Sequence, residues 1–257
     1  SKRKLLPILT DQLPLIGYDR YVEPFSGSAC LFFHLSPRHA LLGDINWELV
    51  NTYRQIKTRH EEVFEAIKAI RGKSSSAFYK VRHQVVENLS RVQRSARFIY
   101  LNRLCFNGLY RTNTQGHFNV PFGGTTRSIH LPTSAELSAI SRSLRDTRFM
   151  ACSFETVLHQ VRPGDFVYLD PPYSISNRRV FNNYSTDVFG TENLALLKTE
   201  LARMNTLGVP FLLSYGLSKE GLELAEGFRV RHTFVQRQIS GFANHRRRAR
   251  ELLISNY

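Results

Sequence analysis

The sequence predicts an α/β protein whose open sheet is interrupted by a helical, basic insert. Within residues 21–45, a strand, a turn of small residues, a helix and a second strand follow one another, which is a βαβ unit. Apolar residues then recur at helical spacing from residue 47 onward, and strand patterns resume only after residue 148. Of the 35 Lys and Arg residues 17 lie between residues 51 and 150, against only 6 of the 21 Asp and Glu residues.

The first elements form the opening of the predicted sheet. A short helical stretch covers residues 5–15, and the first strand runs over residues 21–25. The small residues Ser26-Gly27-Ser28 turn the chain into a helix over residues 30–35. The second strand, residues 40–45, ends close to an acidic residue. Ligands of such sheets bind at the carboxyl ends of the strands, so we expect site residues after these strands.

The insert is predicted to be mainly helical. Apolar spacing indicates helices over residues 47–70, 76–89 and 92–104. Residues 106–124 differ, because they alternate in polarity, contain three Asn residues and Arg111, and turn at Gln115-Gly116. This pattern predicts a hairpin or a long loop.

Strand patterns in the last third of the chain complete the sheet. Apolar segments predict strands over residues 149–154, 165–169 and 209–214, and a helix over residues 191–207. Two final strands are expected over residues 228–239 and 251–257. Together with the first two strands, these make seven.

The charge distribution predicts a polyanionic partner. The chain carries a formal net charge of +14, of which residues 51–150 contribute +11. Nucleic acids favour such surfaces because neutralised phosphates release counterions. A surface that serves only solubility is the alternative. A membrane surface is disfavoured, because the basic residues do not line one side of an apolar helix.

Several other classes are excluded by composition. No apolar run approaches the roughly 18 residues of a membrane span, and no secretory signal follows the basic first residues. The three cysteines are far apart, which argues for a reducing compartment and against a Cys-x-x-Cys metal site. The nine histidines show no zinc-ligand spacing, so we expect no metal.

The segment Asp170-Pro171-Pro172-Tyr173 carries the chemistry. It follows an apolar strand. Its two prolines lack the backbone N–H needed to continue the strand's hydrogen bonding, and they restrict the backbone of the turn. The Asp170 carboxylate and the Pro171 carbonyl then form two convergent acceptors, and Tyr173 can stack on a base. Two such acceptors suit the exocyclic amino group of a nucleobase, because they favour pyramidalisation and expose its lone pair. A proline turn that merely caps a strand is the alternative.

These motifs resemble those of Dam-type (alpha group) DNA adenine-N6 methyltransferases. The matching segments are Asp170–Tyr173, Glu23–Ala29, Leu101–Gly123 and the tail from Gln236 to Leu253. The resemblance implies a Rossmann-like, mixed seven-stranded methyltransferase sheet with an inserted, hairpin-bearing recognition domain. It assigns residues 1–50 and 149–257 to the catalytic domain, which binds S-adenosylmethionine, and residues 51–148 to target recognition.

The resemblance also implies a set of cofactor-binding residues. Asp44 would bind the ribose hydroxyls, Ile45 would pack on the cofactor's adenine, and the turn after the first strand would hold the methionine part. The family usually has a second glycine where Ala29 stands. The expected set is Lys2, Pro24, Phe25, Ser26, Gly27, Ser28, Ala29, Asp44, Ile45, Ser153, Phe154 and Asp170. The catalytic set is Asp170, Pro171, Pro172 and Tyr173.

A third set is expected to contact DNA. Arg111 suits bidentate reading of guanine O6 and N7, and Phe106 and Asn107 could wedge into the base stack. Tyr184 lies in a segment that would close over an extruded base, and Arg246 and Arg247 either contact phosphates or form a solvated face. The complete set is Arg103, Phe106, Asn107, Leu109, Arg111, Asn113, Asn119, Pro121, Tyr184, Arg246 and Arg247.

The function implied is methyl transfer from S-adenosylmethionine to adenine N6 in double-stranded DNA, by base flipping, with GATC as the first candidate target. A cytosine-N4 or RNA amino methyltransferase and a catalytically inactive DNA-binding protein are the alternatives. The enzyme would be a cytoplasmic monomer from a bacterium or phage. It would act alone or beside a cognate restriction endonuclease.

Overall fold

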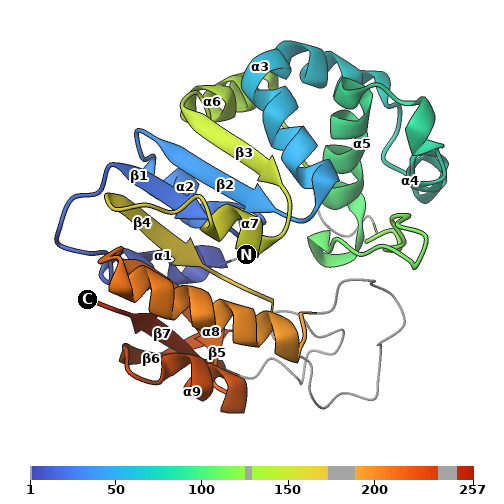
Figure 1. Ribbon diagram of the computed structural model, residues 1–257. Helices are drawn as coiled ribbons and strands as arrows, with labels where there is room; N and C mark the ends of the chain where they lie inside the picture. Colours follow the sequence, from blue (N-terminus) through green and yellow to red (C-terminus); the bar gives the residue numbers. More distant parts are fainter. Residues whose placement is uncertain (1, 125–128, 173–188, 237–247) are drawn as a thin grey trace. The chain divides into compact units, whose positions relative to one another are not determined.

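The central element of the fold is a mixed seven-stranded sheet (Figure 1). A computed structural model describes residues 2–124, 129–172, 189–236 and 248–257. In these residues the strand order is β3-β2-β1-β4-β5-β7-β6, and β7 runs antiparallel to both neighbours. The strands are β1 Arg20–Glu23, β2 Ala40–Asp44, β3 Thr147–Ala151, β4 Asp165–Leu169, β5 Phe211–Gly216, β6 Arg229–Gln236 and β7 Arg248–Ser255. The predicted α/β class and mixed sheet are confirmed.

The described residues form two compact units. The first contains the chain up to Ile45 and from Asp146 onward, and it includes the whole sheet. The second runs from Asn46 to Arg145. The first boundary coincides with the start of a helix, where the Asn46 side chain caps by accepting the Leu49 N–H at 3.3 Å.

Both faces of the inner parallel strands β1, β2, β4 and β5 are buried in the first unit, whereas most residues of the edge strand β6 are exposed. Successive side chains of a strand point to opposite faces, and a parallel sheet is therefore apolar on both. Helices α7 and α8 cover one face, where their apolar residues pack with Val22, Val167 and Leu213 (Figure 1). The helices of this unit are η1 Lys2–Leu5, α1 Leu6–Thr10, α2 Cys30–Leu35, α7 Phe154–Leu158, α8 Thr191–Thr206 and α9 Lys219–Ala225.

Gly43 allows α7 to approach strand β2 closely. A Cβ at Gly43 would lie 2.3 Å from Cγ2 of Val157, a fully buried residue of α7. We therefore expect Gly43→Ala to lower the free energy of unfolding by about 1–3 kcal/mol, as overpacking does. Urea denaturation measures this, and Gly17→Ala is the matched control because nothing lies within 4 Å of its Cβ position. Equal stabilities of the two variants would contradict the packing account.

The second unit is helical. Apolar residues of α4, α5 and the following segment form its core, among them Phe78, Tyr100, Leu104 and Phe118. Helix α5 begins with a capping box in which Ser90 and Gln93 satisfy each other's backbone N–H groups. The elements are α3 Trp47–Ala69, α4 Ser75–Arg82, η2 Val86–Asn88, α5 Arg91–Leu104, η3 Phe106–Gly108 and α6 Ser134–Ser143.

The expected hairpin is present in an irregular form. Antiparallel bridges join Cys105 to Phe122 and Thr112 to Phe118. The turn at its tip is held by Asn113, whose Oδ1 accepts the N–H groups of Gln115 and His117 at 3.1 and 2.9 Å. Such an Asx turn explains why the sequence changes direction here.

Several expected boundaries were wrong. The strand expected over residues 149–154 is Thr147–Ala151, because the Ser153 hydroxyl accepts the Thr156 N–H and starts α7 instead. The helix expected over residues 76–89 ends at Arg82, and the one expected over residues 5–15 ends at Thr10. Helices α6 and α9 were not predicted. No helix in the described parts of the chain is both long and apolar enough to cross a bilayer.

Candidate functional site

The candidate site lies where three neighbouring parallel strands end. Strands β2, β1 and β4 lie side by side, and carboxylates stand at or next to their carboxyl ends: Asp44, Glu23 and Asp170. Ligands of open α/β sheets bind at this edge. All three carboxylates belong to the first unit.

The turn after β1 is joined to the end of β2 by two hydrogen bonds. The Ser26 N–H donates to the Gly43 carbonyl at 2.8 Å, and the Gly27 N–H donates to Oδ2 of Asp44 at 2.9 Å. Gly27 has a left-handed backbone with φ +45°, and no atom lies within 4 Å of its Cβ position. A ligand can therefore approach the backbone here without meeting a side chain.

Ala29 takes the position of the family's usual second glycine. Its φ of 46° is left-handed, a conformation that costs a residue with a Cβ about 1–2 kcal/mol. The Ala29 N–H donates to the Ser26 carbonyl at 2.6 Å, and its methyl group is buried. The methyl group of Ala29 therefore faces protein, and the turn keeps the glycine-like backbone.

An aromatic cluster supports the same turn. The ring of Phe25 stacks on Phe154 with centroids 5.1 Å apart and meets the edge of Phe189 at 5.9 Å. Phe154 belongs to the buried core, and the Ser153 hydroxyl caps α7. Ile45, by contrast, is 61% exposed beside Asp44, so it offers an apolar surface to a ligand.

Among the described residues, two side chains from distant parts of the chain contact the Asp170 carboxylate, and a third binds one of them. Its Oδ1 lies 3.2 Å from Nζ of Lys2 and accepts the Ser214 hydroxyl at 3.1 Å. Lys2 also donates to Oε2 of Glu251 at 2.7 Å. Burial raises the pKa of Asp170; Lys2 opposes this, the Glu251 charge adds to it, and the Ser214 bond opposes it. The side chain is still 26% exposed, so a substrate can reach it.

Glu23 is a second acidic group at this edge. It is buried, and its Oε2 accepts the Tyr21 hydroxyl at 2.9 Å. Burial raises the pKa of Glu23 well above its usual range; the Tyr21 bond opposes the shift, and the charge of Asp170 adds to it. Glu23 is therefore neutral over a wider pH range than a surface glutamate.

The two prolines after Asp170 differ in exposure. Pro171 is buried directly after Asp170, and Pro172 is exposed. Four expected site residues lie outside the described residues: Tyr173, Tyr184, Arg246 and Arg247.

In the second unit, the hairpin holds Arg111 in a defined orientation. The Arg111 Nε donates to Oδ1 of Asn119 at 2.7 Å, and the Asn119 N–H donates to the Arg111 carbonyl at 3.0 Å. The Arg111 side chain is exposed. One terminal nitrogen, Nη2, also donates to the Asn119 carbonyl at 3.5 Å, so the hairpin fixes the plane of the guanidinium through two contacts.

The remaining insert residues surround the base of this hairpin. Phe106 is 40% exposed and donates its N–H to the Pro121 carbonyl at 2.9 Å. Asn107 has a left-handed φ of 55°, and its side chain is exposed. Leu109 packs partly against the core, whereas Arg103 is exposed on the last turn of α5. An aromatic ring and an amide are therefore both presented to solvent.

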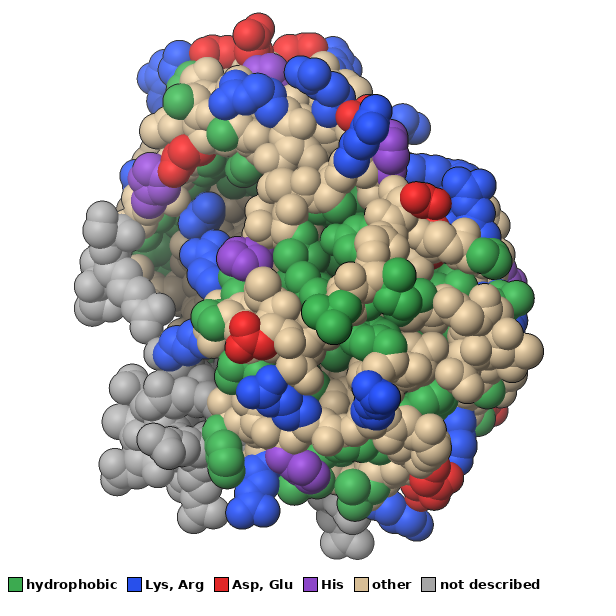
Figure 2. Space-filling model, turned by 90° about the vertical axis from the view of Figure 1, so that its left-hand side faces the viewer, with side chains coloured by type: hydrophobic (Ala, Val, Ile, Leu, Met, Phe, Trp, Pro, Cys, Tyr) green, Lys and Arg blue, Asp and Glu red, His purple; other side chains and the backbone are tan. Residues whose placement is uncertain are grey.

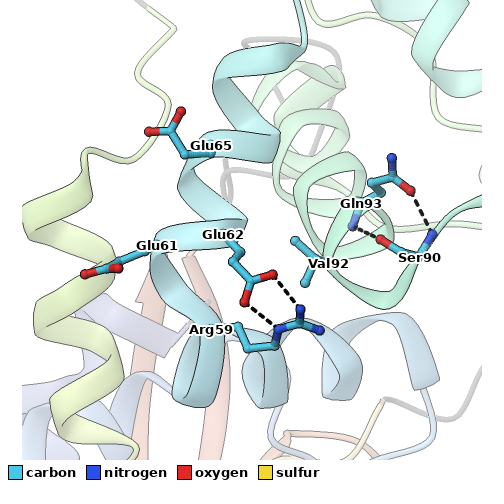
Figure 3. A pocket seen from close by; sticks show the side chains of 7 residues that line it. All are labelled: Arg59, Glu61, Glu62, Glu65, Ser90, Val92 and Gln93. Atoms are coloured by element: carbon cyan, nitrogen blue, oxygen red, sulfur yellow. Dashed lines mark hydrogen bonds and ion pairs between the residues drawn. The ribbon is translucent and has the colours of Figure 1, made fainter.

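Positive and negative side chains are unevenly distributed over the surface. On the face shown in Figure 2, Lys and Arg side chains are more abundant than Asp and Glu. The hollow drawn in Figure 3 differs, because Glu61, Glu62 and Glu65 line it and Arg59 is paired with Glu62 at 2.7 Å. Such a hollow repels phosphates, so we do not place nucleic acid there.

The sheet order and the motif positions define a Rossmann-like methyltransferase. The chain belongs to the D12 class N6 adenine-specific DNA methyltransferase family, whose model matches residues 1–239. It is therefore an enzyme that methylates adenine in DNA, as the sequence resemblance implied. In the described residues, no three His, Cys, Asp or Glu side chains form a metal-binding group.

Curated relatives cover nearly the whole chain. The type II methyltransferase M1.LlaDCHI of Lactococcus lactis subsp. cremoris is 32% identical, over 100% of this chain and 93% of its own length. The type II methyltransferase M.MjaIII of Methanocaldococcus jannaschii is 30% identical, over 100% and 96%. The DNA adenine methylase of Escherichia coli K12 is 29% identical, over 90% and 84%.

Sequence reasoning missed three side chains around Asp170. Ser214, Glu251 and Tyr168 were predicted only as parts of strands, and Lys2 was expected at the cofactor. A polar residue at the end of an apolar strand, as at Ser214, was the one available signal. Which strands become neighbours of β4 is not visible in local sequence.

Proposed function

We propose that this enzyme transfers a methyl group from S-adenosylmethionine to N6 of an adenine flipped out of double-stranded DNA, within the target GATC. The observation that carries the proposal is the partly exposed Asp170 carboxylate at the end of β4, followed by the buried Pro171. Family membership supports adenine N6 as the acceptor.

The residues of the first unit fit S-adenosylmethionine. The open backbone of Gly27 accommodates the methionine part, and the Asp44 carboxylate can accept the ribose hydroxyls. Exposed Ile45 can pack on the adenine ring, and Phe154 supports the turn through Phe25. When bound, the cofactor supplies an electrophilic methyl group on a sulfonium.

At the acceptor, Asp170 and the Pro171 carbonyl each take one N–H of the adenine amino group. This directs the N6 lone pair outward, and positioning then supplies much of the rate. As N6 gains the methyl group it must lose a proton. Burial raises the pKa of Asp170, which makes its carboxylate a better proton acceptor than a surface aspartate. We assign stacking on the base to Tyr173.

On the DNA, the exposed residues of the insert would read and open the site. Arg111 would recognise guanine, while Phe106 and Asn107 would fill the space left by the flipped base. Arg103, together with Arg246 and Arg247, would contact phosphates, and Tyr184 would close over the base. A monomer suffices when each strand is modified separately.

The proposal is tested with labelled methyl donor and matched nucleic acids. We expect N6-methyladenine, identified by nucleoside mass spectrometry, in a duplex that contains GATC. A duplex in which the target adenine is replaced and an RNA of the same sequence should remain unlabelled. Label in N4-methylcytosine or in RNA would contradict the proposal, and methylation at another sequence would contradict the GATC target alone.

The role of Asp44 predicts a selective loss of cofactor affinity. Asp44→Ala removes the carboxylate, and because hydrogen bonds to charged groups are worth about 1.5–3 kcal/mol, affinity should fall about 10- to 100-fold. Calorimetry with S-adenosylhomocysteine measures this without turnover. Asp11→Asn, on an exposed residue after α1, is the control. Unchanged affinity in Asp44→Ala would exclude Asp44 from the cofactor site.

A further inference from the structure

A line of hydroxyl groups lies behind Asp170 on one face of the sheet. Tyr168 and Asp170 are two residues apart at the end of β4, so their side chains share a face. Ser214 lies on the neighbouring strand β5 and is 0% exposed. The Tyr168 hydroxyl lies 3.3 Å from Ser214 Oγ, which lies 3.1 Å from Oδ1 of Asp170.

The direction of these bonds follows from the number of protons. Ser214 has one hydroxyl proton, and an ionised carboxylate can only accept, so that proton is donated to Asp170. Tyr168 must then donate its own proton to Ser214. The resulting order, Tyr168 to Ser214 to Asp170, is strongest while Asp170 is ionised, because a charged acceptor makes the stronger hydrogen bond. Asp170 protonated on Oδ2 still accepts the Ser214 proton on Oδ1, but as an uncharged and therefore weaker acceptor.

Lys2 makes a second contact with the same oxygen of Asp170. Lys2 lies 3.2 Å from Oδ1, and Glu251, which is 2% exposed, binds Lys2 at 2.7 Å. Both contacts that the described residues make with the Asp170 carboxylate therefore fall on Oδ1. These contacts of the described residues therefore hold the carboxylate through Oδ1.

We propose that Ser214 is a positioning residue: with its donor Tyr168 it holds Oδ1 of Asp170 so that Oδ2 accepts the N–H of the target amino group. This inference rests on the proposed catalytic role of Asp170. Ser214 acts through Asp170 and touches neither the base nor the methyl donor.

The pH dependence of the reaction gives a signature of this role. Within the described part of the chain, the charged and titratable groups that act on Asp170 include Lys2, Glu251 and Tyr168, with Glu23 on the adjoining strand β1. The Ser214 bond lowers the pKa of Asp170, so its removal raises that pKa further. The ionised form of Asp170 accepts the amino N–H. As the pH is lowered, the rate of a variant without the Ser214 bond should therefore begin to fall at a higher pH than the rate of the wild type.

The experiment measures single-turnover methyl transfer as a function of pH for Ser214→Ala, with DNA and methyl donor saturating. At neutral pH we expect a rate about tenfold lower, the effect of one hydrogen bond to a charged group. The acidic limb should move to higher pH, so that the deficit shrinks as pH rises. The KM values for DNA and methyl donor should stay unchanged, and Ser214→Thr, which keeps a hydroxyl, should restore the profile.

Two further variants separate the possible failures. Ser255→Ala is the control. It removes a hydroxyl at the end of β7 that donates to the Tyr257 carbonyl, and we expect the pH profile to stay unchanged. Asp170→Asn, measured in parallel, tests the catalytic carboxylate itself. An inactive Asp170→Asn beside a Ser214→Ala variant with wild-type rate and profile would overturn this inference alone. An active Asp170→Asn would overturn the proposed catalytic role of the Asp170 carboxylate, and a loss in Ser214→Ala equal at all pH values would indicate a structural role.

Discussion

Replacing Asp170 by alanine is expected to reduce methyl transfer by about 10²–10⁴-fold or more, the range seen when a group acting directly on the reacting atoms is removed. The substitution deletes one of the two acceptors for the amino group and the first acceptor for its proton. Asp170→Asn keeps the shape and one carbonyl oxygen, yet its amide N–H₂ group can accept no proton. We therefore expect it to be nearly as slow. Single-turnover transfer of labelled methyl groups measures both.

The fold should tolerate these two variants. Burial raises the pKa of Asp170, which means that folding disfavours its ionised form at neutral pH. Replacing the carboxylate by a neutral side chain therefore costs no favourable electrostatic free energy of folding. Lys2 also keeps its partner Glu251 at 2.7 Å. We expect Tm and DNA affinity, measured by fluorescence anisotropy, to stay close to wild type. An equal loss of DNA binding and methylation would instead show that Asp170 has a structural role.

Replacing Arg111 by alanine is expected to relax sequence preference at a single base pair. A good bidentate contact with guanine discriminates by about 1–3 kcal/mol, so kcat/KM for the cognate duplex should approach that for duplexes changed at that position. The bond from Nε of Arg111 to Oδ1 of Asn119, at 2.7 Å, sets the plane of the guanidinium. Arg111→Lys should therefore also lose discrimination, because lysine keeps the positive charge but lacks the planar guanidinium that makes a bidentate contact.

A set of duplexes, each with one base pair altered, measures this effect. Arg142→Ala, on an arginine of α6 that donates to Ser138 at 3.0 Å, is the control for lost positive charge in the insert. If Arg111→Ala weakens binding equally for all duplexes and reduces the slope of log affinity against log salt concentration by about one, Arg111 contacts a phosphate. That outcome would contradict the reading role.

Local patterns were sufficient for the elements that flank the site. The turn at Ser26–Ser28, the strand before Asp170 and the hairpin between residues 106 and 124 each follow from residue types within a few positions. Boundaries were predicted less well, because caps decide them: the Ser153 hydroxyl ends a strand pattern by starting α7. Phe154, expected among the cofactor-binding residues, is buried in the core against Phe25 at the first residue of α7.

By itself, the sequence determined the class of enzyme, the order of its motifs and the carboxylate Asp170, because these depend on residues adjacent in the chain. Only the tertiary structure placed Lys2, Ser214 and Glu251 around that carboxylate. Lys2 lies in η1, Ser214 in β5 and Glu251 in β7. The fold brings them together although Lys2 and Glu251 are 249 positions apart in the chain. The surroundings that set the charge and orientation of Asp170 are therefore a property of the folded sheet, since burial and electrostatic contact depend on distance in space.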